Sequence, residues 1–188
     1  MPDETQPALT IPKTIKSTMK ITCIRDAKDL QTLENEWNAL LRESSSDSVF
    51  LTWEWISTWW EIFGSAFSLR VLAARDEQGA LLGIAPLMIG REKILGRTFR
   101  ALMIIGQKGD TLAEYLDFFI RKGTEAIVAN EFLAYIQTEL RPEWDLLFFE
   151  RILSESPNLG IIRQQLGGAL IDGELKSPFV TLPVDSWS

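Results

Sequence analysis

Histidine is absent from this 188-residue chain, and cysteine occurs only once, at Cys23. The missing imidazoles exclude histidine-based triads, histidine general bases and histidine metal ligands within the chain. A single cysteine cannot form an internal disulfide, so nothing in the sequence points to an oxidising compartment. Cys23 lies in a short apolar run, where a buried and inert thiol is the expected state.

Long apolar runs and an excess of positive charge are also missing. No apolar stretch approaches the ~20 residues that span a bilayer, and the N-terminus lacks the apolar core of a secretory signal. The formal net charge is −7, so the chain as a whole lacks the basic footprint of a nucleic-acid-binding protein. We therefore expect a cytoplasmic protein with no nucleic-acid partner and no membrane span.

A tryptophan-rich stretch dominates what is present, since four of the seven tryptophans lie in residues 50–64. On a helical wheel the apolar side chains fill one half, and polar or charged side chains fill most of the other. We predict an amphipathic helix with Thr52 as its N-cap and Gly64 as its C′ residue. Its indoles are expected to form core. The alternative is that an edge indole, Trp55 or Trp59, stacks on a ligand.

The order of the remaining elements predicts an α/β fold. Residues 1–19 have the composition of a disordered leader, and residues 20–188 are expected to form the domain. The expected elements around the tryptophan helix are a strand at 21–24, a helix capped by Asp26, strands at 69–75, 80–89 and 98–105, a helix at 124–140, a strand at 145–149, a helix at 161–166 and a strand at 179–182. This order predicts a mixed, largely antiparallel sheet flanked by helices.

Three features are expected to shape the antiparallel part of this sheet. Gly79 ends a tight turn in which a positive φ is required. Pro86 lies inside the second strand and removes one donor, which indicates an edge or a bulge. Residues 90–96 are rich in charge and are expected to form a turn.

Carboxylates and a tyrosine gather around the predicted strand ends. The set consists of Asp110, Glu114, Tyr115, Asp117 and Glu150. Such a group can bind an amine or a sugar hydroxyl, or act as a general base. The alternative is that these acids are ordinary solvated loop residues, because acids are mostly exposed whatever their role.

The segment 164–169 has the spacing of the acyl-CoA pyrophosphate loop of GNAT acetyltransferases. Such a loop binds phosphate oxygens through backbone N–H groups at a helix N-terminus, so it needs a strand before it and a helix after it. Here a helix is predicted before the segment and a strand-like run after it. A helix C-cap is therefore the favoured interpretation, and the phosphate loop is the alternative.

Several stretches carry a family resemblance when they are taken together. They are Phe50–Trp60, Asp76–Leu87, Gly106 followed by Tyr115–Asp117, Trp144–Phe148 and Phe179–Pro183. As an ordered set, from about residue 21 to the C-terminus, they resemble the N-terminal half of CelD-like proteins. These are a bacterial GNAT-type acyltransferase family linked to cellulose and other exopolysaccharide biosynthesis, similar to FemAB-type proteins with two GNAT-like halves.

The resemblance implies transfer of an acyl group from acetyl-CoA or another acyl-CoA to an amine or hydroxyl of a polysaccharide or cell-envelope precursor. It also implies a second GNAT-like half that carries the acyl-CoA loop, so this chain is expected to be a half-domain without that loop. Asp110, Tyr115 and Asp117 stand where the family has an acidic–aromatic motif near the cleft between the halves.

Two other functions are compatible with the sequence. One is a non-catalytic GNAT-like module that binds a partner, or a second copy of itself, through an exposed apolar surface. The other is membrane-surface binding through the tryptophan helix. This second alternative is disfavoured because Glu54 and Glu61 place the wrong charge on the polar face of that helix for anionic lipid.

Overall fold

The strands of the protein form two sheets, seen here in a computed structural model that describes residues 19–109, 113–166 and 173. The strands are β1 Lys20–Ile24, β2 Ser68–Leu69, β3 Val71–Arg75, β4 Leu81–Ala85, β5 Leu87–Ile94, β6 Arg97–Ile104, β7 Phe119–Ile120 and β8 Leu146–Leu147. Each sheet has four strands, in the orders β1-β3-β4-β7 and β2-β5-β6-β8. Only the β6–β8 ladder is parallel among those described. The predicted leader and the predicted strand at 179–182 lie outside the described residues.

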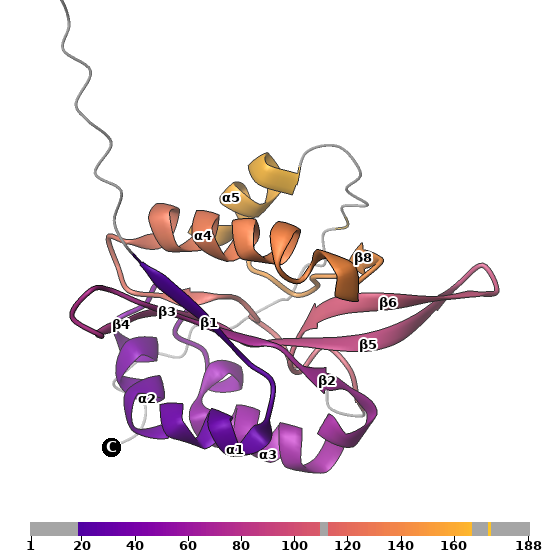
Figure 1. Cartoon of the computed structure of the whole chain (residues 1–188), viewed down its shortest axis with the longest axis horizontal. Coiled ribbons are helices and arrows are strands. Elements are labelled where there is room, and N and C mark those ends of the chain that lie inside the picture. The colour runs from indigo at the N-terminus through magenta and orange to yellow at the C-terminus, as the bar shows by residue number, and fades with distance from the viewer. Residues whose placement is uncertain (1–18, 110–112, 167–172, 174–188) are drawn as a thin grey trace, which may run out of the picture.

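Helices cover both faces of these sheets. They are α1 Ala27–Leu30, α2 Glu34–Arg42, α3 Trp53–Phe63, α4 Glu125–Thr138 and α5 Pro157–Leu166. In Figure 1, α4 and α5 lie on one side of the strands and α1 to α3 lie on the other. The predicted α/β fold, with a largely antiparallel sheet flanked by helices, is confirmed. In the part of the chain that is described, no helix has the length and apolar character needed to cross a bilayer.

The chain passes between the two sheets at Arg70 and Pro86. Arg70 separates β2 from β3, and Pro86 separates β4 from β5, so two strands that were expected to be continuous are each divided. The breaks are bridged from neighbouring strands, because Arg70 N donates to Leu87 O at 2.9 Å and Ile105 N donates to Pro86 O at 2.8 Å. Proline cannot donate to a ladder. Pro86 therefore marks a junction between sheets rather than a sheet edge.

The prediction that residues 90–96 form a turn is wrong. Strand β5 continues to Ile94 and β6 begins at Arg97, so only Leu95 and Gly96 form the turn. Their φ values are 48° and 81°, as a two-residue type I′ hairpin requires. The charged residues of this stretch thus lie along a two-stranded ribbon. By contrast, the turn that ends at Gly79 forms as expected, with φ of 85°.

The tryptophan helix forms where it was predicted, as α3. The Thr52 hydroxyl accepts a hydrogen bond from Trp55 N at 3.4 Å, which confirms the N-cap. Trp53, Ile56 and Trp59 are buried. They face the core, as the helical wheel predicted.

The C-terminal end of α3 differs from the prediction. The helical wheel places the apolar side chains on one half of the helix, yet Ile62 is 61% exposed. Gly64 has φ of −62° and continues into a 3₁₀ turn, so it is not a left-handed C′ residue. A Cβ at this position would lie 2.7 Å from ring atoms of Trp60. Glycine is therefore required here because an indole packs directly on the backbone.

Trp37 packs helices α2 and α3 against the sheet that contains β7. It is fully buried, and its ring N–H donates to Leu51 O at 2.7 Å. Its ring centroid lies 5.6 Å from that of Trp53 and 5.0 Å from that of Phe119. Aromatic pairs at these separations add to the burial of apolar area. This contact fixes β7, and with it the loop that precedes β7, against α2 and α3.

Candidate functional site

The loop before β7 holds a buried carboxylate, that of Asp117, which is 4% exposed. Its Oδ2 accepts hydrogen bonds from the hydroxyls of Ser46 at 2.8 Å and Ser156 at 2.5 Å. Its Oδ1 accepts from Asn158 Nδ2 at 3.1 Å and from Phe118 N at 2.7 Å. Burial raises the pKa of Asp117 above its usual value of 3.8, although these four hydrogen bonds oppose the rise.

A cavity of about 430 Å³ opens beside this carboxylate. Three carboxylates line it, those of Asp47, Asp117 and Glu155, together with four serines, and its described lining contains no lysine or arginine. The remaining lining is apolar or aromatic and includes Phe50 and Tyr115. A concave site with apolar walls and a few converging polar groups is the usual form of a small-molecule pocket. The negative charge of this cavity favours a ligand that carries a cation or hydroxyl groups.

The backbone at the rim of the cavity is strained. Tyr115 and Arg151 have φ values of 57° and 63°, in the left-handed region that bulky residues avoid. The two segments are joined by a hydrogen bond from Leu116 N to Arg151 O at 3.0 Å. Each such residue costs on the order of 1 kcal/mol, and such strain clusters at binding sites. Tyr115, one of the two strained residues, lines the cavity and is 38% exposed.

Asn158, at the start of α5, carries an unused acceptor. Its Nδ2 donates to Asp117 and also to Phe118 O at 2.7 Å. Its Oδ1 is buried and has no hydrogen-bond partner among the described residues. Buried polar atoms are nearly always satisfied, so this atom sets the Asp117 network apart from the ordinary core.

The structure brings some of the predicted site residues together. Tyr115 and Asp117 line the same cavity. Trp55 is half-buried, and its ring meets that of Phe50, another lining residue, edge-on at 5.5 Å. Trp59 is 3% exposed, and its N–H donates to Lys108 O at 3.2 Å. Asp110 lies outside the described residues.

Sequence reasoning missed the groups that hold Asp117 in place. Ser46, Ser156 and Asn158 were not among the residues selected from the sequence. Ser46 lies in the polar loop 44–48, and Ser156 and Asn158 lie in the loop 150–158. Ser46 and Ser156 are 71 and 39 positions from Asp117 along the chain. No local sequence pattern indicates that residues so far apart in the chain are in contact. The polar character of both loops was the one available signal.

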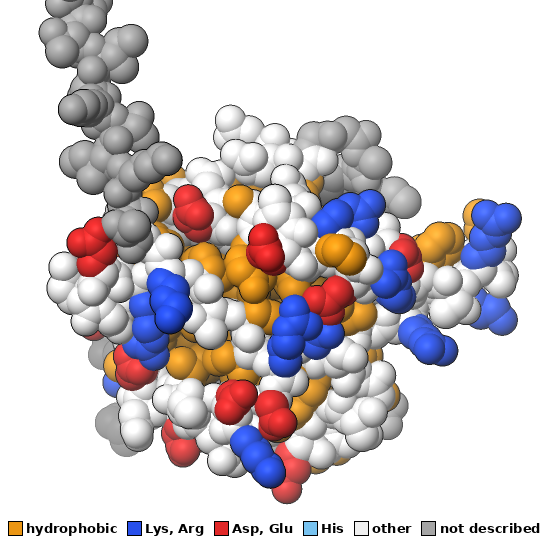
Figure 2. Space-filling view, viewed as in Figure 1, with side chains coloured by type: hydrophobic (Ala, Val, Ile, Leu, Met, Phe, Trp, Pro, Cys, Tyr) orange, Lys and Arg blue, Asp and Glu red, His pale blue; other side chains and the backbone are white. Residues whose placement is uncertain are grey.

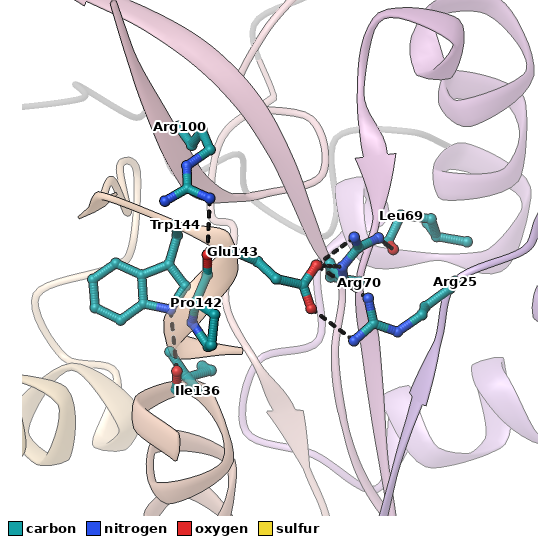
Figure 3. Close-up of polar contacts among 8 residues, drawn as sticks. All are labelled: Arg25, Leu69, Arg70, Arg100, Ile136, Pro142, Glu143 and Trp144. Carbon is teal, nitrogen blue, oxygen red and sulfur yellow. Dashed lines mark hydrogen bonds and ion pairs between the residues drawn. The ribbon is translucent and has the colours of Figure 1, made fainter. Parts of the chain in front are cut away.

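A second cavity, of about 550 Å³, has four charged residues in its lining, Arg70, Arg91, Arg100 and Glu143. Glu143 accepts from Arg25 at 2.8 and 3.1 Å and from Arg70 at 2.7 and 2.5 Å (Figure 3). Arg100 donates to Asp145 at 2.7 Å and to Pro142 O at 2.8 Å. The hydrogen bond from Arg25 is the main reason that the pKa of Glu143 falls below its usual value of 4.5. We assign the ion pairs of Glu143 and Asp145 a structural role, because arginines already hold both carboxylates.

The described residues do not fit the pyrophosphate of acyl-CoA. Helix α4, which follows strand β7 and a short loop, has the position that such a site needs. At its N-terminus the Glu125 carboxylate accepts from Gly123 N at 2.7 Å, so an acid already occupies the place where a phosphate would bind. The other candidate, segment 164–169, extends beyond Leu166 and lies partly outside the described residues.

No family model matches the chain, and no curated protein matches it by sequence. Several solved structures do resemble the chain in their three-dimensional fold. An aminoglycoside acetyltransferase from an uncultured soil metagenomic sample aligns at 13% identity over 88% of this chain and 99% of its own, with a TM-score of 0.53. A possible acetyltransferase from Clostridium difficile 630 aligns at 13% identity over 87% and 99%, with a TM-score of 0.49. The first likeness shows that the fold is that of GNAT acetyltransferases.

Proposed function

We propose that this chain is the acceptor-binding half of a GNAT-type acyltransferase that acts in polysaccharide or cell-envelope biosynthesis. The reaction would move an acyl group from acyl-CoA to an amine or hydroxyl of a glycan precursor or small molecule. The observation that carries the proposal is the acidic cavity around Asp117. The fold supports acyl transfer only by analogy. The aminoglycoside acetyltransferase that shares the fold supports an acceptor with both amine and hydroxyl groups.

Asp117 has the properties of a general base for the acceptor. An attacking amine or hydroxyl must lose a proton as it is acylated, and a carboxylate with a raised pKa takes a proton more readily than an ordinary one. Asp47 and Glu155 would attract an ammonium group to the cavity. Ser46 and Ser156 would hold the Asp117 carboxylate in one orientation through their hydrogen bonds.

The acyl donor is assigned to another part of the enzyme. The acid at the N-terminus of α4 argues against a pyrophosphate site there. The resemblance to proteins with two GNAT-like halves supplies the alternative, in which the second half binds acyl-CoA. Calorimetric titration of this chain with acetyl-CoA should therefore show no binding. Micromolar affinity, about −8 kcal/mol, would place the donor site in this chain and overturn the half-enzyme assignment.

The acceptor site can be tested with a pair of sugars. Glucosamine carries an amine and hydroxyls, whereas glucose has only hydroxyls. Glucosamine should bind, as followed by NMR chemical-shift changes, and Asp117→Asn should weaken that binding by about tenfold or more, because a charge-assisted contact is lost. Asp145→Asn, which changes an exposed carboxylate outside the cavity lining, is the matched control. Unchanged binding by the Asp117 variant would remove that residue from the site.

A non-catalytic binding module is the second candidate, and the acid at the N-terminus of α4 favours it. Such a module would use the same fold to hold a partner or a second copy of itself. It predicts self-association, measured by light scattering at increasing concentration. A strictly monomeric chain that binds glucosamine would count against the module and for the acceptor-binding half.

A further inference from the structure

The hairpin formed by the outer ends of β5 and β6 projects from the body of the protein. Strand β2 pairs with β5 only at Met88 and Ile89, and β8 pairs with β6 only at Ala101 and Leu102. Four register pairs lie beyond them, from Arg91–Arg100 to Ile94–Arg97, and no other described strand accompanies them. At about 3.4 Å per residue these pairs extend roughly 14 Å. We call residues 91–100 the arm; it points to the right in Figure 1.

The tip of the arm is apolar and fully exposed. Ile94 is 44% exposed and Leu95 is 100% exposed. Leu95 also has φ of 48°, a conformation that is unfavourable for an L-residue with a bulky side chain. Asparagine or aspartate would suit this turn position better in both conformation and solvation. Leucine suits neither the conformation nor the solvation of this position. Its presence indicates that the tip contacts an apolar partner.

The sides of the arm are basic, although the chain carries a net charge of −7. The arm holds Arg91, Lys93, Arg97 and Arg100 against the single acid Glu92, which pairs with Lys108 at 2.9 Å. Arg91 and Arg100 are direct cross-strand partners, so two like charges face each other, and of the two only Arg100 is paired with a described acid. Figure 2 shows the Lys and Arg side chains gathered on this projection, next to apolar atoms.

Three of these cations are available to an outside anion. Arg100 is paired with Asp145. Arg91, Lys93 and Arg97 form no ion pair with any residue that the structure describes. All three side chains are exposed, and Arg91 also lines the second cavity. A partner that offers closely spaced negative charges around an apolar interior would match both the sides and the tip of the arm.

We propose that the arm docks on an anionic lipid surface. Ile94 and Leu95 enter the boundary between headgroups and acyl chains, while Arg91, Lys93 and Arg97 contact lipid phosphates. A nucleic acid would match the charge but would leave the aliphatic tip without a partner.

The test is co-sedimentation of the 188-residue chain with vesicles of phosphatidylcholine, made with and without phosphatidylglycerol. Binding is expected only to the vesicles that contain phosphatidylglycerol, and it should weaken as salt is added. Leu95→Asn should reduce the affinity at least about tenfold through lost apolar burial. Lys93→Gln with Arg97→Gln should reduce it about 30-fold, from about 1 kcal/mol for each cation near the surface.

The variants are chosen so that unfolding cannot mimic the effect. Leu95→Asn places a favoured residue in the turn and should not lower the unfolding midpoint. Ile127→Gln is the control, because it removes an apolar side chain of α4 that is 55% exposed and lies outside the arm; its vesicle binding should equal that of the unaltered chain.

Several outcomes would overturn the proposal. They are an absence of binding to anionic vesicles, equal binding to neutral vesicles, or unchanged binding by Leu95→Asn. A lipid-free dimer that Leu95→Asn abolishes would assign the arm to a second copy of the chain instead. None of these results depends on whether glucosamine binds, so the acceptor site and the arm can fail separately.

Discussion

Asp117 and Glu143 each accept four hydrogen bonds, yet their pKa values move in opposite directions. The four donors to Asp117 are neutral hydroxyl, amide and backbone groups. The four donors to Glu143 belong to the guanidinium groups of Arg25 and Arg70. Burial outweighs neutral donors and raises the pKa of Asp117, whereas the two arginines lower that of Glu143.

On the proposed function, the difference separates a carboxylate that would take a proton from a ligand, Asp117, from one that holds neighbouring segments together, Glu143. A carboxylate held by two cations is committed to its charge and to its partners, so it has little capacity to accept a proton from a ligand. A carboxylate held by neutral donors beside an open cavity can still accept one. The number of hydrogen bonds is therefore a poor guide to function here, and the charge of the donors is a better one.

The largest expected effect in this comparison is on stability, from Glu143→Gln. The change leaves Arg70, whose side chain is 16% exposed, without its acid. Breaking a buried pair costs 3–5 kcal/mol and an exposed one under about 1, so we expect a loss of about 2 kcal/mol for this partly solvated pair. Urea unfolding measures it. Glu36→Gln, at a more exposed arginine pair, should cost clearly less.

Ser156→Ala should have the next largest effect. It removes one neutral donor from Asp117, so we expect a loss of about 1 kcal/mol in unfolding free energy and a further rise in the pKa of Asp117. Ser45→Ala is the matched control, since the exposed Ser45 donates a long hydrogen bond of 3.4 Å to the partly exposed Glu125. Equal stability of the two variants would show that the Asp117 network contributes little to the fold.

The dependence of stability on pH should have opposite signs at the two carboxylates. Asp117 keeps its proton in the folded state above its usual pKa of 3.8, so stability falls as the pH rises from there to the folded value. Glu143 stays charged in the folded state below its usual pKa of 4.5, so its contribution is present above that pH and is lost as the pH falls below it.

Variants separate the two contributions. Urea midpoints for Asp117→Asn and Glu143→Gln, measured from about pH 3 to about pH 7, are each compared with the unaltered chain. Rising pH should favour the Asp117 variant relative to the unaltered chain. Falling pH should bring the Glu143 variant closer to it. Parallel profiles for the two variants would contradict the opposite pKa shifts.

The smallest effect is expected at the exposed pair of Asp145 and Arg100. The hydrogen bonds from Arg100 lower the pKa of Asp145 to about 2. Solvent nevertheless screens this pair, and pairs of this kind contribute little to stability. Asp145→Asn should therefore leave the urea midpoint within error of the original. A loss as large as that of Glu143→Gln would show that exposure does not distinguish the two clusters.

Much of the fold was predictable because burial leaves a periodic trace in the sequence. The helix from Trp53 to Phe63 and the order of strands and helices follow from that trace. The outer part of β5, residues 90–94, was mispredicted as a turn for the opposite reason. It is mostly charged and exposed, so it lacks the alternation that marks a half-buried strand. The strand breaks at Arg70 and Pro86 depend on contacts with neighbouring strands, which no local pattern records.

The candidate site was predictable only in part. Tyr115 and Asp117 were selected from their position near a strand end, and both lie at the cavity; their role in binding stays a prediction. The serines and Asn158 that hold Asp117 come from distant segments, so only the folded chain identifies them. The pKa of Asp117 was equally hidden, because it depends on burial in three dimensions.

The distance along the chain between these segments has a consequence for the order of folding. The β5–β6 hairpin closes through two residues and belongs to the fastest class of folding events, on the order of microseconds. The Asp117 network requires contacts across 71 and 39 residues, and contacts of such separation form late. The cavity is thus completed only when the chain is nearly native. A ligand that occupies it will select that last state and stabilise the whole domain by mass action.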